Sequence, residues 1–184
     1  MENKILLPRT HLSWSQMSCW ISSPARYRRE YFEDGKKLDT KFLRFGKGIA
    51  EMIEQGKHKK LLPDLIVYPV REHEIRTMVC GVPILSYLDD YDPEKNVFRE
   101  KKTGKIPWTQ EKVIKHGQLV FYATALYHSC GKMPEYCDLD WIETREGAVE
   151  MDDFWRENEK IIQATGNIKS FHREFDTREI DRME

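Results

Sequence analysis

The middle of the chain contains three short segments in which apolar and polar residues alternate. They cover residues 74–80, 82–91 and 96–102, and the run DPEKN at 92–96 separates the second from the third. Alternation with a period of two places successive side chains on opposite faces of a strand, and Asp, Pro and Asn are typical turn residues. The pattern therefore predicts a strand meander, which must bury its apolar face against other elements.

Helical patterns lie on both sides of these strands. Three helices are expected before them, beginning near Ser13, near Ser23 and at Asp39 or Thr40, because a short polar side chain can cap the first turn. Together these patterns predict one α/β domain over residues 1–184. After the meander we expect a helix over 109–129, a strand over 136–144, a turn at 145–147, an amphipathic helix over 152–165 ended by Gly166, and a short helix opening at Asp176.

The composition is that of a globular protein with a well-hydrated surface. Charged residues make up 33% of the chain, and 30 Lys and Arg nearly balance 31 Asp and Glu. This balance excludes a uniformly basic nucleic-acid coat, although a local basic face is compatible with it. No apolar run approaches the roughly 20 residues of a spanning helix, so we expect a cytoplasmic protein without a membrane partner. The four cysteines form no C-x-x-C pair, which argues against a zinc site or a disulfide framework.

Chemically versatile side chains follow one another in a definite order through the middle of the chain. Asp89 ends an apolar strand, and Glu100 and Lys102 lie two residues apart on the next. Gln118 and Tyr122 lie four apart on the following helix, which puts them on one helical face. Two convergent carboxylates suit Mg²⁺ or Mn²⁺, and a lysine beside them can activate water or offset charge on phosphorus. The order predicts a hydrolytic metal centre.

Each fragment alone has an ordinary structural explanation. Asp89 can end a strand beside a turn, and Glu100 with Lys102 can protect a sheet edge from pairing. Gln118 and Tyr122 can mark the boundary of an amphipathic helix. The joint occurrence of the fragments, in this order and on these elements, favours the functional interpretation of the acids and the lysine.

Together these segments resemble the RecB-type branch of the PD-(D/E)XK nuclease superfamily over most of residues 12–127. Asp89 matches the acid at a strand end, EKKTG at 100–104 matches the acid-x-Lys-Thr-Gly motif, and QLVFY at 118–122 matches Gln-x-x-x-Tyr. The opening LSWS and the later SPARY also resemble the start of that family. The resemblance implies a restriction-endonuclease-like core, in which helices flank a central mixed sheet and a helical segment precedes it.

The resemblance also implies a metal-dependent DNA nuclease, similar to compact phage or mobile-element enzymes of recombination, repair or processing. Exonuclease and endonuclease action both remain open. Mg²⁺ or Mn²⁺ would be held by Asp89 and Glu100. The implied catalytic residues are Asp89, Glu100, Lys102, Gln118 and Tyr122.

The chain departs from the family pattern at two places. Many members carry a metal-binding His before the sheet, and Ala50 stands at that position. The neighbouring Glu51 can supply an oxygen ligand instead, with Glu54 as a weaker substitute. The alternative function is that of a catalytically inactive nucleic-acid-binding or scaffold subunit of the same fold within a larger complex, and the choice between DNA and RNA remains open. Ser23 replaces the cysteine that iron–sulfur members place before the early proline, and no C-terminal cysteine triplet follows, so no iron–sulfur cluster is expected.

Nucleic-acid and protein contacts are expected at a few further positions. Arg26 and Lys105 are the first choices for phosphate contacts, and Gln118 and Tyr122 are expected to contact the same backbone. His116 is expected at the surface, at most as a DNA contact. The segment 167–184 is a candidate docking element for a protein partner.

Overall fold

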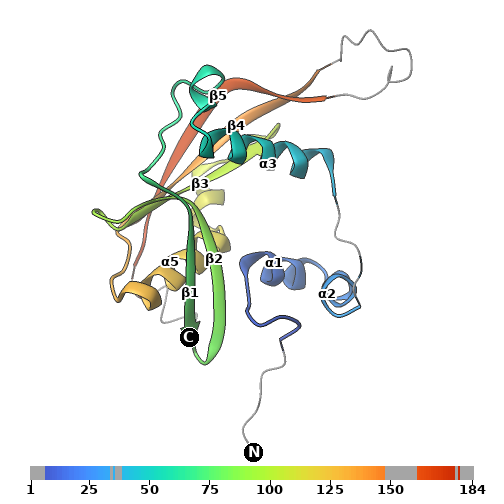
Figure 1. Ribbon diagram of the computed structural model, residues 1–184, viewed down its shortest axis with the longest axis vertical. Helices are drawn as coiled ribbons and strands as arrows, with labels where there is room; N and C mark the ends of the chain where they lie inside the picture. The colour runs from blue at the N-terminus through green and yellow to red at the C-terminus, as the bar shows by residue number, and fades with distance from the viewer. Residues whose placement is uncertain (1–6, 34, 36–38, 148–160, 177, 179–184) are drawn as a thin grey trace, which may run out of the picture.

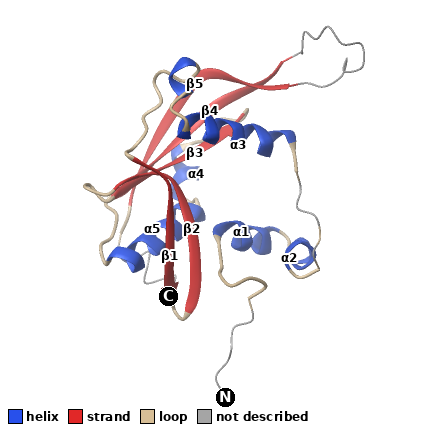
Figure 2. Ribbon diagram, viewed as in Figure 1, coloured by secondary structure: helices blue, strands red, loops and turns tan. Residues whose placement is uncertain are grey.

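A computed structural model describes residues 7–33, 35, 39–147, 161–176 and 178, and its centre is a five-stranded sheet (Figures 1 and 2). The strand order is β1-β2-β3-β4-β5, with β3 and β4 parallel and the other neighbours antiparallel. The predicted mixed α/β sheet is confirmed. The strands are β1 (Val70–Val79), β2 (Val82–Asp92), β3 (Val97–Gly104), β4 (Tyr136–Gly147) and β5 (Ile161–Glu174).

Helices precede the sheet and cross between its parallel strands. Ser23 and Thr40 cap their helices as expected, each accepting a hydrogen bond from a backbone N–H of the first turn. Among the described residues, no helix combines the length and apolar character needed to cross a membrane. The helices are α1 (Trp14–Ser22), α2 (Pro24–Tyr31), α3 (Lys41–Glu54), the 3₁₀ turn η1 (His58–Lys60), α4 (Gln110–Ile114) and α5 (Gly117–Cys130).

Two apolar clusters hold helices on the sheet. The larger one packs α5 against the sheet, with Leu119 among side chains of β2, β3 and β4 such as Leu88, Phe98 and Leu139. The smaller one packs α3, through Ile49 and its neighbours, on Ile142 of β4. Leu139 and Ile142 belong to opposite faces of one strand, because successive side chains alternate. The sheet is therefore covered by α5 on one face and by α3 on the other.

The segment before α1 closes a gap at the edge of β2. Leu12 forms a parallel bridge with Ile84, donating its N–H to the carbonyl of Pro83 and accepting the N–H of Leu85. This half of β2 lies beyond the residues that pair with β3. Leu12 thus satisfies backbone groups that β3 leaves unpaired.

The helix expected over 109–129 is interrupted. Lys115 and His116 separate α4 from α5, and His116 adopts an extended backbone conformation. The cause is the approach of Trp14, because a Cβ added to Gly117 would lie 2.7 Å from Cη2 of that ring. A straight helix through these residues would not leave room for the indole.

The sequence-based prediction was wrong after residue 144. The expected turn at 145–147 lies within β4, and residues 161–165, expected to end a helix, begin β5. Gly166, expected to end that helix, sits at φ 91° where the β4–β5 register shifts. Long-range pairing with β4 overrides the local helical pattern. Residues 152–160 and most of the short helix expected from Asp176 lie outside the described residues.

The C-terminal segment contributes to the sheet in its first half. Residues 167–174 belong to β5 and pair with β4, and Phe175 packs against the larger cluster. The rest of the expected docking element, apart from 175, 176 and 178, lies outside the described residues. Truncation after Thr165 would therefore remove most of an integral strand.

The contact at Gly117 predicts opposite effects of one substitution at two helical glycines. Gly117→Ala should lower the free energy of unfolding by about 1–3 kcal/mol, because the new Cβ overlaps the packed Trp14 ring. Gly48→Ala, on α3 with no atom within 4 Å of its added Cβ, should raise it by about 0.5–1 kcal/mol. Urea unfolding of the two variants measures both. A stabilised Gly117→Ala would contradict the proposed cause of the helix break.

Candidate active site

The site begins where β2 and β3 separate. The two strands pair only at Asp90 with Arg99 and over the following two residue pairs. Immediately beyond, Asp89 turns its carboxylate to β3, and Oδ2 accepts the backbone N–H of Lys101 at 2.6 Å. The Asp89 carboxylate thus accepts the hydrogen bond that a backbone carbonyl of β2 would accept in a continued sheet. It also places a negative charge beside β3 just beyond the last paired residues.

A chain of hydrogen bonds joins β3 to α5. Nζ of Lys102 donates to Oε1 of Glu100 at 2.6 Å and to Oε1 of Gln118 at 2.7 Å. Nε2 of Gln118 donates in turn to the hydroxyl of Tyr122 at 2.8 Å. The period of two on β3 and the spacing of four on α5 place these four side chains together. An ammonium has three donors, so one N–H of Lys102 is left for a further acceptor.

Burial and like charge govern the electrostatics of this cluster. Burial and then the negative charge of Asp89 raise the pKa of Glu100, and Lys102 offsets that rise only in part. Burial lowers the pKa of Lys102, but the Glu100 carboxylate outweighs burial and leaves the pKa raised. Burial, reinforced by Glu100, also raises the pKa of Tyr122, which keeps its hydroxyl protonated. The site thus holds a crowded carboxylate pair beside a charged lysine.

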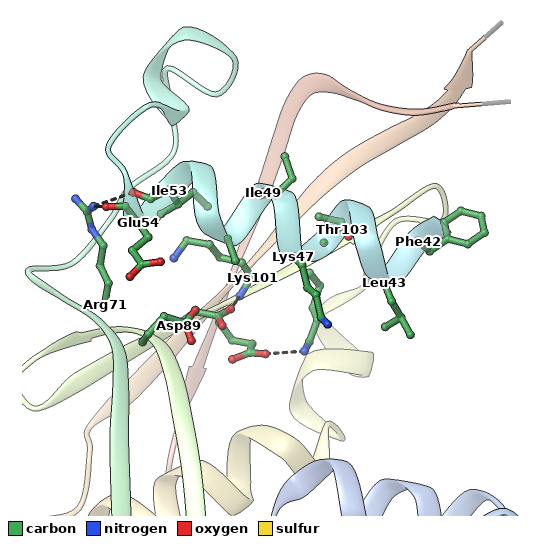
Figure 3. Close-up of a pocket in the computed structure, with 15 residues that line it drawn as sticks. Phe42, Leu43, Lys47, Ile49, Ile53, Glu54, Arg71, Asp89, Lys101 and Thr103 are labelled. Carbon is green, nitrogen blue, oxygen red and sulfur yellow. Dashed lines mark hydrogen bonds and ion pairs between the residues drawn. The ribbon is translucent and has the colours of Figure 1, made fainter. Parts of the chain in front are cut away.

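These groups line a pocket of about 450 Å³ beneath α3 (Figure 3). Asp89, Glu100 and Lys102 form its sheet side, while Ala50, Lys47 and other α3 residues form its helical side. Nη1 of Arg71 donates to the last-turn carbonyls of Ile53 and Glu54 at 2.8 and 2.7 Å. This contact ties the C-terminal end of α3 to β1 above the carboxylates.

The pocket contains two acids beyond Asp89 and Glu100. Glu72 of β1 lies between the register pairs Arg71–Asp90 and His73–Leu88, next to Asp89, at a φ of 46° that is unusual for a residue other than glycine. Partial burial and then the charges of Asp89 and Glu54 raise its pKa. Glu54 also lines the pocket, whereas Glu51 is exposed and is not among the lining residues. Sequence reasoning did not find Glu72, because only the pairing of β1 with β2 brings it to Asp89.

The carboxylates of the pocket are ligands of the type that a divalent cation prefers, but they do not form a complete coordination shell. Within the described ranges, no three His, Cys, Asp or Glu side chains are grouped as metal ligands. Asp89 and Glu100 each have one carboxylate oxygen engaged, and their second oxygens, Oδ1 and Oε2, have no hydrogen-bond donor among the described residues. Hard oxygen ligands with neighbouring open positions suit Mg²⁺ or Mn²⁺, which keep several waters. Such a cation would also relieve the repulsion between the carboxylates.

The remaining charges of β3 serve a structural role. Arg99 donates to Asp138 and Asp140 of β4, each at 2.7 Å, and Lys101 pairs with the fully buried Asp90 of β2. These side chains alternate with Glu100 and Lys102 along the strand. They fix β3 to both neighbouring strands, and Lys101 in addition lines the pocket beside Glu100 and Lys102.

The two basic residues chosen for DNA contact lie outside the pocket. Arg26 on α2 pairs with Glu30 of the same helix at 2.6 Å. Lys105 is exposed in the turn after β3. Neither residue lines the pocket, in contrast to Lys47, Arg71 and Lys101.

The chain is similar to known proteins in its three-dimensional structure. No protein-family model matches the chain, and no curated protein is similar to it in sequence. The solved structures that match include a Eubacterium rectale protein with a provisional exonuclease assignment and a phage-related exonuclease from Haemophilus somnus. The chain shares the fold of these two structures.

The similarity to these two structures is one of backbone arrangement, with low sequence identity. The E. rectale protein is 9% identical, with a TM-score of 0.57 over 94% of this chain and 75% of its own. The H. somnus protein is 13% identical, with a TM-score of 0.51 over 85% of this chain and 71% of its own. At such identities the likeness concerns architecture alone, and it agrees with the predicted core of a mixed sheet flanked by helices.

His116 does not lie at the surface as expected. Its ring packs between Trp14 and Trp108, with centroid distances of 6.1 and 4.8 Å, and its Nδ1 is buried without a hydrogen-bond partner. Burial, followed by the positive charges of Lys102 and Lys112, lowers its pKa to about 4. The spacing of residues around His116 does not indicate this burial, because the covering indole comes from Trp14, far away in the chain.

This burial predicts a pH-dependent contribution to stability. In the unfolded chain the His116 pKa is about 6.5, so between pH 6.5 and about 4 the unfolded state binds the proton more readily than the folded state. The free energy of unfolding therefore decreases as the pH is lowered through this range. His116→Gln should remove this loss, which we expect to be about 1–3 kcal/mol. Urea unfolding of both proteins at pH 7.5 and pH 4.5 measures it. Parallel losses in wild type and variant would refute a neutral, buried imidazole.

Proposed function

We propose that the chain is a metal-dependent DNA nuclease of the RecB-like type. The observation that carries this proposal is the convergence of Asp89, Glu100 and Lys102 where β2 and β3 separate, within a pocket. Two carboxylates and an ammonium are the groups that phosphodiester hydrolysis requires for a cation, a water and a developing charge. The shared fold and the exonuclease names of the similar structures support the same class.

Asp89 and Glu100 would hold the Mg²⁺ or Mn²⁺. When bound, the cation supplies Lewis acidity and lowers the pKa of water in the site. The second oxygens of the two carboxylates are the donors available for it.

Lys102 acts on the phosphodiester in this proposal. Two of its N–H groups are engaged by Glu100 and Gln118, and the third can donate to a water or a phosphate oxygen. Charge on a non-bridging oxygen grows during attack at phosphorus, so a fixed ammonium stabilises that charge more than the ground state. Gln118 and Tyr122 are positioning residues, because their hydrogen bonds hold Lys102 toward the site.

A DNA-binding subunit without catalysis is the second candidate. Ala50 lines the pocket at the position where the family carries a metal-binding His. The structure therefore has a methyl group where that family has a ligand. Binding of DNA without cleavage in either metal would favour this function.

The proposal predicts metal-stimulated cleavage that depends on the lysine and the acid. Wild type should hydrolyse single- or double-stranded DNA with Mg²⁺ or Mn²⁺, and Lys102→Ala and Glu100→Gln should each lower the rate about 100-fold or more. Gel or fluorescence assays with end-labelled and circular DNA measure the rates and separate end-dependent from internal cutting.

Lys95→Ala serves as the matched control. Lys95 is exposed in the β2–β3 turn, and its substitution should leave the rate within about twofold of wild type. Cleavage that persists in both Lys102→Ala and Glu100→Gln would contradict the proposed nuclease site. Circular dichroism shows whether the variants remain folded.

The acids of the pocket predict a second difference, in metal binding. Glu72→Gln should weaken Mn²⁺ binding about tenfold, because the lost negative charge lies next to Asp89. Glu51→Gln should leave binding within about twofold, since that side chain is exposed and does not line the pocket. Calorimetry without DNA gives both affinities. The reverse ranking would restore Glu51 as the ligand and exclude Glu72.

A further inference from the structure

The first turn of α3 presents large apolar side chains to the pocket instead of to the core. Phe42 and Leu43 line the pocket, yet their exposed fractions are 50% and 54%. Phe45, three residues after Phe42 along α3, packs against the smaller apolar cluster. Helix α3 is therefore held on the sheet by other residues, and burial in the core does not explain Phe42 and Leu43.

Positive charge accompanies these apolar side chains. Lys41, Arg44 and Lys47 follow one another at intervals of three, and the first turn of α3 has no acid. Nζ of Lys41 lies 5.5 Å from the Phe42 ring centroid and is held by Glu146 at 2.9 Å. Lys47 lines the pocket between Phe42 and Leu43 on one side and Asp89 on the other (Figure 3).

The two ends of the pocket thus differ in chemistry. Figure 3 shows Phe42 and Leu43 at the far end of α3 from Glu54 and Arg71, with Lys47 and Asp89 between them. At a rise of 1.5 Å per residue, Leu43 and Phe42 lie about 10–12 Å along α3 from Ala50, which faces the carboxylates. The apolar end of the pocket is therefore separated along α3 from the carboxylate end, so a bound strand could contact both ends through different nucleotides.

We propose that Phe42 and Leu43 form a platform for the unpaired bases of single-stranded DNA whose backbone passes the carboxylates. This inference rests on the proposed nuclease function and specifies its substrate class. An aromatic ring stacks on any unpaired base, whereas the bases of a duplex already stack on each other. Lys47, which lines the pocket beside them, complements the phosphates of the same strand, whereas Lys41 and Arg44 already pair with Glu146 and Asp39.

Binding without cleavage tests the platform directly. Fluorescence anisotropy in EDTA compares one labelled oligonucleotide, single-stranded and as a duplex, on wild type and on Phe42→Ala. Single-strand binding should weaken about tenfold, while duplex binding changes less than twofold. Leu43→Ala should show a smaller loss of the same kind, and Phe42→Trp should keep wild-type affinity.

Phe32→Ala is the matched control. Phe32 has the same exposed fraction of 50% but follows α2 and does not line the pocket, so its removal should leave both affinities unchanged. The inference is overturned if Phe42→Ala and Leu43→Ala bind the single strand like wild type, or if Phe42→Ala weakens both DNA forms equally. The failure of the proposed nuclease function looks different, since it would appear as absent metal-dependent cleavage by wild type.

Discussion

The separation of β2 from β3 is the constraint on which this structure depends. A strand that leaves its ladder exposes a backbone N–H that needs an acceptor, and Asp89 supplies one to Lys101. The charge of the same carboxylate raises the pKa of both Glu100 and Glu72. One side chain therefore ends the pairing of two strands and starts the acidic side of the pocket. Stability of the junction and chemistry of the site share this group.

Strand β3 carries charge on both of its faces, and its neighbours neutralise each face differently. Arg99 and Lys101 are buried against carboxylates of β4 and β2, where an unpaired charge would cost several kcal/mol. Glu100 and Lys102 instead pair with each other at the pocket. A slip of β3 by one residue would exchange the two sets, so the buried pairs select the register that points Glu100 and Lys102 toward α5.

The sequence was sufficient for the parts of the fold that depend on local pattern. The meander, the caps at Ser23 and Thr40 and the grouping of Glu100, Lys102, Gln118 and Tyr122 follow from spacing within single elements. Features that depend on distant segments could not be predicted in this way.

Those distant contacts explain each difference from the prediction. Trp14 interrupts the long helix and covers His116, and pairing with β4 turns residues 161–165 into a strand. Glu72 reaches the site only through the β1–β2 register. The placement of α3 likewise decides that Ala50 and Glu54 line the pocket while Glu51 does not. A helical stripe identifies a buried face, but it does not say how far the helix is rotated over a cleft.

The bridge at Leu12 gives the opening segment a protective role. Open strand edges invite pairing with other chains, and the half of β2 beyond β3 would be such an edge without Leu12. Leu12 thus shields this edge of the sheet against intermolecular strand addition. A tag or a proteolytic cut that displaces Leu12 would expose the unpaired backbone groups of β2 and so favour self-association of the protein.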